Sequence, residues 1–367
     1  MKILQLGKFH PIRGGVEKVM LDLTAGLSQR GIGCDMLCAS LDGSYEIPLN
    51  SHGRIIATRS AAKIKATMIS PAMVLRLRKI CSSYDIIHIH HPDPMAALAL
   101  RLSGFKGKVV LHWHSDILRQ RQLLRLIRPL QSWLLRRADA IVTTSPAYLE
   151  ASPWLAPFRG KCRCIPIGID PLPEATAERV RALRNRYDNR RIVFSLGRLV
   201  SYKGFEYLID AARLLPDDVV VLIGGTGPLH DEMQHRIDSA GLSGKVMLIG
   251  YVADEDLPVY YRAASLFCMS SVERTEAFGV VLIEAMSCAT PVVATDIPGS
   301  GVPWVNADGV SGKNASPRSS ESLAHAISDV LSDRSGSYSD KAHERYRSLF
   351  TGPQMISSVL SLYKELL

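Results

Sequence analysis

Short apolar runs of strand length alternate with longer amphipathic segments along the chain. In the first half, helical spacing of apolar residues predicts helices at 16–29, 94–103, 117–137 and 146–152. Near-continuous Val, Ile and Leu runs are typical of strands that are buried on both faces of a parallel sheet. The first half therefore predicts an α/β domain with strands at residues 2–6, 34–39, 85–90, 109–114, 140–144 and 162–167.

The same alternation starts again after a polar stretch, residues 170–190, where we place the linker. We expect two doubly wound, Rossmann-like α/β domains that face a cleft, formed by residues 1–170 and 171–352. The last segment, 353–367, predicts an amphipathic helix that packs back on the first domain. Apolar runs predict the strands of the second domain at 191–197, 219–225, 246–250, 264–270 and 291–295.

The two halves differ in charge. The chain of 367 residues carries a formal net charge of +9, yet residues 1–170 hold 24 Lys and Arg against 11 Asp and Glu. The remaining residues hold 20 basic and 24 acidic side chains. A basic domain suits an anionic partner such as nucleic acid, anionic lipid or a phosphorylated substrate. Aromatic residues are not interleaved with these charges for base stacking, so we do not expect nucleic acid.

Compartment signals point to the cytoplasm. There is no run of about 18 apolar residues, the length that a spanning helix needs, and the N-terminus lacks the pattern of a signal peptide. The seven cysteines are scattered and odd in number, which favours reduced thiols over a disulfide framework.

A basic segment, residues 118–137, carries six arginines and no acidic residue, with leucines near helical spacing. Such a helix is typical of surfaces that bind anionic lipid, and it predicts peripheral attachment to the inner leaflet of the membrane. An ordinary helix that packs on the sheet and turns its arginines to solvent explains the pattern equally well. A second basic segment, 63–79, lies in the same domain.

Ligands of open α/β sheets bind beyond the carboxyl ends of the strands, so the residues that follow each strand are the first candidates. GRLVSYKG, residues 197–204, follows the first strand of the second domain and opens a helix predicted at 204–214. Arg198 and Lys203 beside a helix N-terminus predict an anion site. Taken alone, two solvated loop cations are the simpler interpretation.

Glycine pairs follow two other strands. Gly14 and Gly15 start a helix after the first strand of the chain, and GGTGP, which contains Gly225, follows a strand of the second domain. Glycine lets the backbone approach a ligand closely. Neither segment has the full spacing of a dinucleotide or Walker loop, so a flexible turn explains each one as well.

ERTEAFGVVLIEAMSCATP, residues 273–291, places two glutamates eight positions apart. Glu276 lies in the loop after a predicted strand, Gly279 stands near the start of a helix, and Glu284 falls within its apolar stretch. Buried carboxylates need partners, and a ligand rich in hydroxyl groups supplies donors to them. A capping Glu276 and a surface Glu284 remain the simpler alternative.

Histidines end two strands of the first domain, at 88, 90 and 91 and at 112 and 114. Strand alternation predicts that 88 shares a face with 90, and 112 with 114. A metal site is conceivable. No carboxylate or cysteine joins these histidines at ligand spacing, so we expect a cleft lining or core histidines and no metal. The acidic run at 254–256 precedes a helix, and acidic residues are favourable at a helix N-terminus, so we do not expect this run to bind a metal.

The order of these motifs resembles the large retaining GT-B glycosyltransferase family of bacterial polysaccharide synthesis, whose E-x7-E pattern matches Glu276 and Glu284. The resemblance spans nearly the whole chain, and the overall pattern is similar to that of O-antigen mannosyltransferases. It implies that Glu276 holds hydroxyls of the donor sugar, that Glu284 holds the nucleotide ribose, and that His114 lies near the transferred sugar. Arg198 and Lys203 would grip the diphosphate. The donor would also meet Gly14, Gly15, Gly225, Tyr251, Ala277, Phe278 and Gly279.

The chemistry agrees with this resemblance. Breaking a sugar–phosphate bond builds negative charge on the leaving phosphate, which cations and a helix N-terminus stabilise. We assign no nucleophile, because front-face transfer with retained configuration needs none, and we expect no metal or other cofactor. The family implies a nucleotide-diphosphate-sugar donor, with GDP-mannose favoured and UDP-hexose possible, and a lipid-linked oligosaccharide acceptor. A GT-B sugar-nucleotide epimerase and a non-catalytic nucleotide- or polyanion-binding module are the alternatives.

Overall fold

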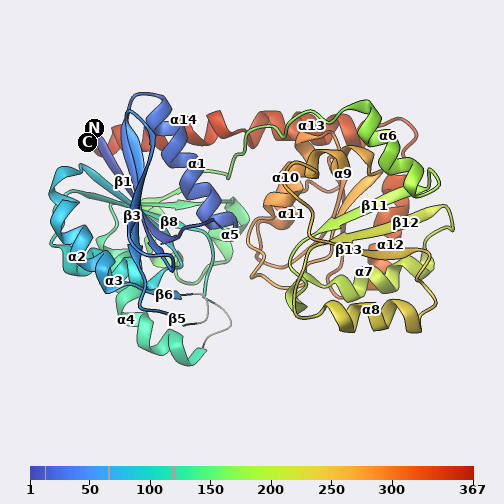
Figure 1. Ribbon diagram of the computed structural model, residues 1–367, viewed down its shortest axis with the longest axis horizontal. Helices are drawn as coiled ribbons and strands as arrows, with labels where there is room; N and C mark the ends of the chain where they lie inside the picture. The colour runs from blue at the N-terminus through green and yellow to red at the C-terminus, as the bar shows by residue number, and fades with distance from the viewer. Residues whose placement is uncertain (13, 65–66, 118–120) are drawn as a thin grey trace. The chain divides into compact units, whose positions relative to one another are not determined.

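The computed structural model describes residues 1–12, 14–64, 67–117 and 121–367; the side chains of 64 and 121–126 lie outside this description. Two compact units make up the chain. Residues Met1–Ile167 and Gly352–Leu367 form the first unit, and Gly168–Thr351 form the second. Each unit is a sheet covered by helices on both faces, which confirms the doubly wound α/β class (Figure 1).

The first unit is built on an eight-stranded sheet in the order β10-β9-β8-β7-β1-β2-β4-β3, parallel except for β3. A short hairpin, β5 and β6, lies apart from it. The strands are β1 Lys2–Phe9, β2 Gly33–Ser40, β3 Tyr45–Asn50, β4 Gly53–Arg59, β5 Ala62–Ile64, β6 Thr67–Ile69, β7 Ile86–His91, β8 Lys108–Trp113, β9 Ala140–Thr143 and β10 Cys162–Cys164. The helices are α1 Gly15–Gln29, α2 Pro71–Ile80, α3 Pro94–Ser103, α4 Arg121–Arg137, α5 Pro146–Ala151 and α14 Gly352–Leu366.

Three helices of this unit begin with the same local signal. Ser70, Asp93 and Ser145 precede α2, α3 and α5, and each side chain accepts a hydrogen bond from a backbone N–H of the first turn. A proline follows each cap at the first helical position, where its missing N–H costs nothing. These caps fix where the chain turns from the sheet edge into a helix.

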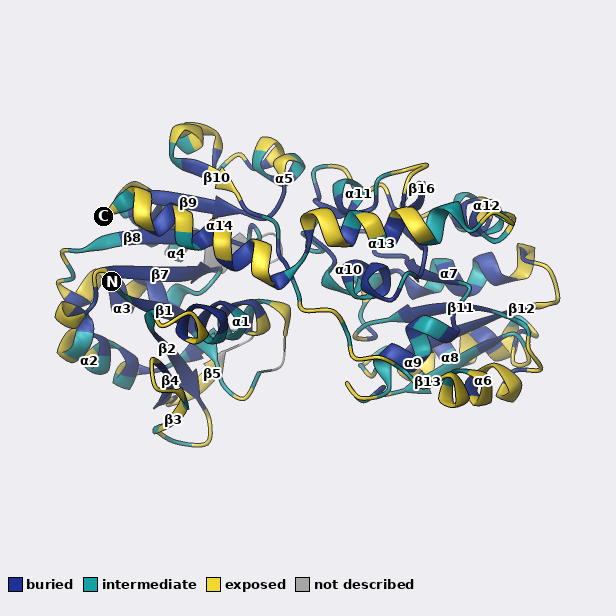
Figure 2. Ribbon diagram, turned by 90° about the horizontal axis from the view of Figure 1, so that it is seen from above, coloured by how far each residue is buried: buried dark blue, intermediate teal, exposed yellow. Residues whose placement is uncertain are grey.

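The second unit contains a six-stranded, wholly parallel sheet in the order β13-β12-β11-β14-β15-β16. Its strands are β11 Arg191–Leu196, β12 Val219–Gly224, β13 Val246–Gly250, β14 Leu266–Met269, β15 Val292–Thr295 and β16 Gly312–Ala315. Its helices are α6 Ala177–Arg186, α7 Phe205–Ala211, α8 His230–Ser239, α9 Leu257–Ala263, α10 Val280–Ser287, α11 Val302–Val305, α12 Ser320–Leu331 and α13 Ser337–Leu349. Figure 2 shows buried central strands in both sheets, with exposed residues along the outer faces of the helices.

Strand order reverses once in each sheet, and this reversal positions candidate sites. The chain builds the first sheet outward in both directions from β1 and β7, and the second from β11 and β14. At such a switch point the loops after the two central strands diverge to opposite faces, which leaves a crevice for ligands.

The final helix, α14, packs on α1 within the first unit (Figure 1). A Cβ atom added at Gly26 would lie 2.1 Å from Ile356 Cδ1, so glycine allows the two helices to approach closely. Arg30 Nη1 donates to Ser357 Oγ at 2.9 Å across the same pair. The expected helix near the C-terminus is therefore present.

Several sequence expectations need correction. The polar stretch 170–190, where the sequence predicts the linker, also contains the unpredicted helix α6, whose single buried residue is Leu183. The strands β3 to β6 and β16 were not predicted. The edge strand β3 is mostly exposed and lacks the apolar run of a buried strand. The helix expected at 204–214 ends as an α-helix at Ala211 and continues as one 3-10 turn. Of the basic helix predicted at 118–137, residues 118–120 lie outside the described residues.

Within the described residues, no helix is both long and apolar enough to span a membrane. All seven cysteines are free thiols, and only Cys164 is exposed.

Candidate functional site

Most of the predicted site residues of the second unit follow the carboxyl ends of four adjacent strands. Tyr251 follows β13, Gly225 follows β12, Arg198 and Lys203 follow β11, and Glu276 follows β14. Because these strands are parallel neighbours, their carboxyl ends lie at one edge of the sheet.

Lys203 and Glu276 form an ion pair at the switch point between β11 and β14. Lys203 Nζ lies 2.5 Å from Glu276 Oε2, and the two side chains are only 12% and 14% exposed. Ser271 Oγ donates to the same carboxylate oxygen at 3.1 Å. Burial lowers the pKa of Lys203, but the charge of Glu276, the nearby Tyr202 and the hydrogen bond to Glu276 together outweigh it and leave the pKa raised. Lys203 therefore stays an ammonium ion, and the structure brings these two predicted residues together.

A glycine makes this pairing possible. Gly204 has φ of 63°, and a Cβ added there would lie 2.3 Å from the carbonyl oxygen of Ser270. Ser270 Oγ in turn donates to the Lys203 carbonyl at 3.0 Å. The loops after β11 and β14 thus pack backbone against backbone, which aims Lys203 at Glu276.

The loop from Glu276 to Gly279 ends at the N-terminus of α10. Gly279 has φ of 83° and no side chain caps the helix. The loop is held by Gly301 N–H, which donates to Ala277 O at 2.8 Å, and by Ser300 Oγ, which donates to Glu276 O at 2.5 Å. Among the described residues, the backbone N–H groups of residues 277–279 donate no hydrogen bond. These donors, with the helix N-terminus, suit an anionic or oxygen-rich ligand.

Gly225 brings the loop after β12 against the loop after β11. Its φ is 127°, and an added Cβ would lie 1.9 Å from the carbonyl oxygen of Gly197. Arg198 is exposed beside this contact, and Tyr251 is 75% exposed. Neither side chain is drawn into the Lys203–Glu276 pair.

Glu284 lies on α10 and does not meet Glu276 in any described hydrogen bond. It accepts a hydrogen bond of 2.8 Å from Tyr261 Oη, which comes from α9. Burial, with the nearby charge of Glu284, raises the pKa of Tyr261 well above its usual value, so Tyr261 remains a donor. The partner of this half-buried carboxylate is thus a phenol of the protein.

Gly14, Gly15 and His114 belong to the first unit. Gly14 is the N-cap of α1 and Gly15 its first residue, and both are exposed. A Cβ added at Gly14 would lie 2.6 Å from Glu17 Oε2, the end of a side chain of the first turn. His114 follows β8 directly and is 5% exposed.

Four histidines stack on one face of the first sheet, as alternation predicted. The rings of His88, His90, His112 and His114 have neighbouring centroids 4.0 to 5.3 Å apart and planes within 11 to 26° of one another. His91 instead stacks on Trp113, with centroids 3.9 Å apart. Nitrogen atoms of three of them (His88, His90 and His112) lie within 4.8 Å of one another. Ring lone pairs lie in the ring plane, so near-parallel rings do not direct them to one metal ion.

Burial keeps these histidines neutral. It lowers the pKa of His91 and His112 to about 3, and the pKa values of His88, His90 and His114 also fall well below 6.5. In the described structure, both ring nitrogens of His112 lack a hydrogen-bond partner. The first unit therefore presents uncharged imidazoles, in contrast to the ion pair of the second.

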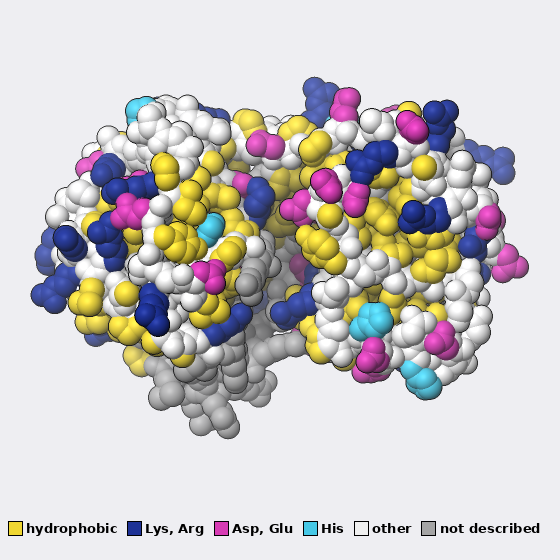
Figure 3. Space-filling model, viewed as in Figure 1, with side chains coloured by type: hydrophobic (Ala, Val, Ile, Leu, Met, Phe, Trp, Pro, Cys, Tyr) yellow, Lys and Arg dark blue, Asp and Glu magenta, His cyan; other side chains and the backbone are white. Residues whose placement is uncertain are grey.

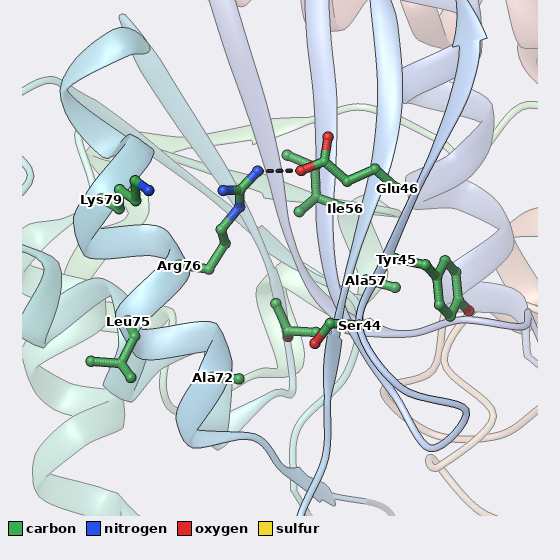
Figure 4. A pocket seen from close by; sticks show the side chains of 10 residues that line it. Ser44, Tyr45, Glu46, Ile56, Ala57, Ala72, Leu75, Arg76 and Lys79 are labelled. Carbon is green, nitrogen blue, oxygen red and sulfur yellow. Dashed lines mark hydrogen bonds and ion pairs between the residues drawn. The ribbon is translucent and has the colours of Figure 1, made fainter.

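A separate hollow of about 460 Å³ lies between β3, β4 and α2 of the first unit (Figure 4). Figure 4 shows Arg76 and Glu46 paired across it. It contains none of the predicted site residues. The candidate site is therefore defined by the chemistry at the sheet edges and not by this hollow.

Sequence reasoning missed several partners of the site. Ser271 is the second residue after β14, so the strand-end rule could have found it. Gln5, whose Oε1 lies 2.8 Å from His90 Nε2, could have been noticed as a polar residue within a buried strand. Tyr261, the partner of Glu284, and Tyr363, whose hydroxyl lies 2.5 Å from His88 Nδ1, carry no such signal, because these contacts depend on packing between distant segments.

Two family models match the chain, one in each half. The model described as "Glycosyltransferase Family 4" matches residues 13–171, and "Glycosyl transferases group 1" matches residues 177–348. O-antigen chain mannosyltransferase C from Escherichia coli is 31% identical over 100% of this chain and 99% of its own length. D-rhamnosyltransferase WbpZ from Pseudomonas aeruginosa is 31% identical over 92% of this chain and 88% of its own.

Solved structures share the fold. Anabaena HepE in complex with UDP superposes with a TM-score of 0.82 at 22% identity, over 100% of both chains. Sucrose-phosphate synthase from Thermosynechococcus elongatus superposes with a TM-score of 0.81 at 24% identity, over 100% of this chain and 99% of the other.

The ion pair predicts a specific pattern of stabilities. Glu276→Ala leaves the Lys203 ammonium buried without its partner and should cost about 3 kcal/mol in the free energy of unfolding. Lys203→Met combined with Glu276→Ala removes both charges and should cost less than the single changes Lys203→Met and Glu276→Ala added together. Urea unfolding of the four proteins gives the coupling energy. Additive effects would show that the two charges do not interact.

The buried histidines predict a pH dependence of stability. Their folded pKa values lie below the unfolded value of about 6.5, so the unfolded chain binds more protons as the pH falls. The free energy of unfolding of the first unit should have its full value above a pH of about 6.5 and fall steadily below it. His112→Leu should reduce this slope by about 1.4 kcal/mol per pH unit. The exposed His230→Gln is the control, and an equal slope in both variants would contradict the assignment.

Proposed function

The chain belongs to the group 1 glycosyltransferases of the GT-B fold, and we propose that it transfers a hexose from a nucleotide-diphosphate-sugar to a lipid-linked oligosaccharide. GDP-mannose is the favoured donor, and the pathway is that of O-antigen or another cell-surface polysaccharide. The observation that carries the proposal is the Lys203–Glu276 pair at the switch point of the second sheet.

Lys203 and Arg198 would hold the diphosphate. An ammonium group has three N–H donors. One of them is used by Glu276, which leaves donors for phosphate oxygens. Arg198 is exposed at the same sheet edge and can bind two phosphate oxygens at once. Both cations stabilise the charge that develops as the sugar–phosphate bond breaks. We propose that this arrangement makes a metal ion unnecessary.

Glu276 would bind the transferred sugar. Both of its described hydrogen bonds, from Lys203 and Ser271, end on Oε2. Its Oε1 has no hydrogen bond among the described residues, so it can accept one from a sugar hydroxyl. The unused N–H groups of Ala277, Phe278 and Gly279 can donate to the donor's oxygens. The described hydrogen-bond partners of Glu276 are a lysine and a serine, so we assign no protein nucleophile, and transfer with retention would proceed on the front face of the sugar.

Glu284 would bind the ribose of the nucleotide. Tyr261 donates to one of its oxygens, Oε2, and fixes the orientation of the carboxylate. A carboxylate oriented in this way can accept hydrogen bonds from neighbouring ribose hydroxyls. Gly225 and Tyr251, at the ends of β12 and β13, would contact the nucleotide. From the first unit, Gly14, Gly15 and His114 would contact the phosphates, the acceptor or the transferred sugar.

The choice of mannose follows from the relatives. The two that are 31% identical are named for mannose and D-rhamnose transfer. The similar solved structures include a UDP complex, so a UDP-hexose is the second candidate.

The acceptor and the membrane are proposed from the surface of the first unit. Figure 3 shows Lys and Arg side chains gathered on this unit, on the side where Figure 1 places α2. Helix α3 packs against both α2 and α4. Leu75 on α2 is 70% exposed beside exposed Arg78 and Lys79. Exposed leucines with basic neighbours suit the surface of an anionic bilayer, where a lipid-linked acceptor resides.

Arg198→Gln tests the transferase directly. Removing one donor to the leaving phosphate should lower kcat/KM by about 10²- to 10³-fold. Folding should be unaffected, because Arg198 is exposed. Transfer from radiolabelled GDP-mannose to a lipid-linked oligosaccharide is measured, with exposed Arg213→Gln as the matched control. Unchanged transfer would refute the role of Arg198. Epimerised donor in the absence of acceptor would identify an epimerase instead.

Neutralising α2 tests membrane binding. Each basic residue near an anionic surface contributes about 1 kcal/mol, so Arg78→Gln with Lys79→Gln should weaken binding to anionic liposomes about 30-fold. Arg334→Gln with Lys341→Gln removes the same charge from the second unit and should change little. Co-sedimentation with anionic and neutral vesicles gives the affinities. Equal loss in both double variants would leave only a nonspecific charge effect and would contradict a docking surface on α2.

A further inference from the structure

A continuous series of buried hydrogen bonds runs through the first unit from α14 to His114. Tyr363 Oη lies 2.5 Å from His88 Nδ1 and accepts a hydrogen bond of 3.1 Å from Gln5 Nε2. Gln5 Oε1 lies 2.8 Å from His90 Nε2. His90 Nδ1 lies 3.0 Å from His114 Nε2. All residues of this series are fully buried except His114, which is its last member.

The carboxamide of Gln5 sets the direction of these hydrogen bonds. Its nitrogen faces Tyr363 and, at 3.9 Å, Cys34 Sγ, so its oxygen faces His90. A carbonyl oxygen only accepts, so the proton of His90 must be on Nε2.

The direction passes on to His114 because both rings are neutral. Burial lowers the pKa of His90 and of His114 well below 6.5, so each ring carries one proton at neutral pH. With its proton on Nε2, His90 can only accept at Nδ1. His114 must then donate from Nε2, which leaves a lone pair on its Nδ1.

We propose that Gln5 is a positioning residue that sets the tautomer of His114 through His90. In this tautomer Nδ1 of His114 accepts a hydrogen bond from a hydroxyl group of the transferred sugar. The inference rests on the proposed function for the identity of the ligand. A lone pair repels phosphate oxygens and attracts hydroxyl protons, so the tautomer selects the sugar over the diphosphate.

Turning the Gln5 carboxamide by half a turn would reverse the donor–acceptor direction of these hydrogen bonds. His90 would then donate from Nδ1, and His114 would present an N–H group at its outer nitrogen. In the observed orientation the hydroxyl of Tyr363 accepts from Gln5 and can donate to His88. Tyr363 comes from α14, so the C-terminal helix contacts this network, but it is the carboxamide of Gln5 that meets His90.

Nitrogen NMR of protein labelled at histidine tests the tautomer without any substrate. The wild-type protein should show His114 protonated at Nε2 and unprotonated at Nδ1. Gln5→Met removes the acceptor at similar volume and should give a mixture of tautomers. Tyr363→Phe disturbs the same buried network on its other side and should retain the Nε2–H form. An Nδ1–H form of His114 in the wild type, or equal effects of both variants, would overturn the proposal.

Deoxyfluoro donors test its consequence. Fluorine accepts but does not donate, so replacing the hydroxyl that His114 contacts should lower kcat/KM by about 10- to 100-fold. In Gln5→Met this discrimination should become smaller, since only part of the population then has His114 in the accepting tautomer. A wild-type enzyme that transfers every fluorinated sugar equally well would overturn the inference while leaving the transferase intact. If no nucleotide-sugar is transferred, the proposed function fails, and the NMR result still decides the tautomer.

Discussion

The contact between Lys203 and Glu276 is the constraint on which the second unit's site depends. Removing two charges from water costs several kcal/mol for each ion, and their attraction offsets this only when the geometry is good and further hydrogen bonds are made. Ser271 provides one of these bonds, and Gly204 allows the close approach of the two loops. A site that already holds its cation and its carboxylate in place loses little entropy when a ligand binds.

The sheets were largely predictable because their strands are apolar along their whole length. The strand-end rule then located Arg198, Lys203 and Glu276 at one sheet edge, since parallel strands all end on the same side. The exposed strand β3 was missed for the opposite reason, since its burial pattern lacks the apolar run of a central strand. Helix α6 was missed because only Leu183 is buried in it, so polarity was taken for a linker.

The pairing of side chains was not predictable from the sequence. Glu276 and Lys203 are 73 residues apart, and Gln5 and Tyr363 are 358 apart. Spacing along the chain carries no information about such contacts, because they depend on how loops and helices pack after the sheets form. The partner of Glu284 illustrates this limit: its apolar surroundings suggested a ligand, and the structure supplies Tyr261 as well.

The two units solve different chemical problems at the ends of their strands. In the second unit a fixed ammonium ion and an exposed guanidinium favour an anion. In the first unit, stacked imidazoles stay neutral, because protonating one ring would place a buried charge beside its neighbours. Neutral rings do not compete with Lys203 and Arg198 for phosphate. Lys203 and Arg198 therefore favour phosphate oxygens, and the neutral rings favour hydroxyl groups. On this argument the neutrality of His114 matters as much for selectivity as the charge of Lys203.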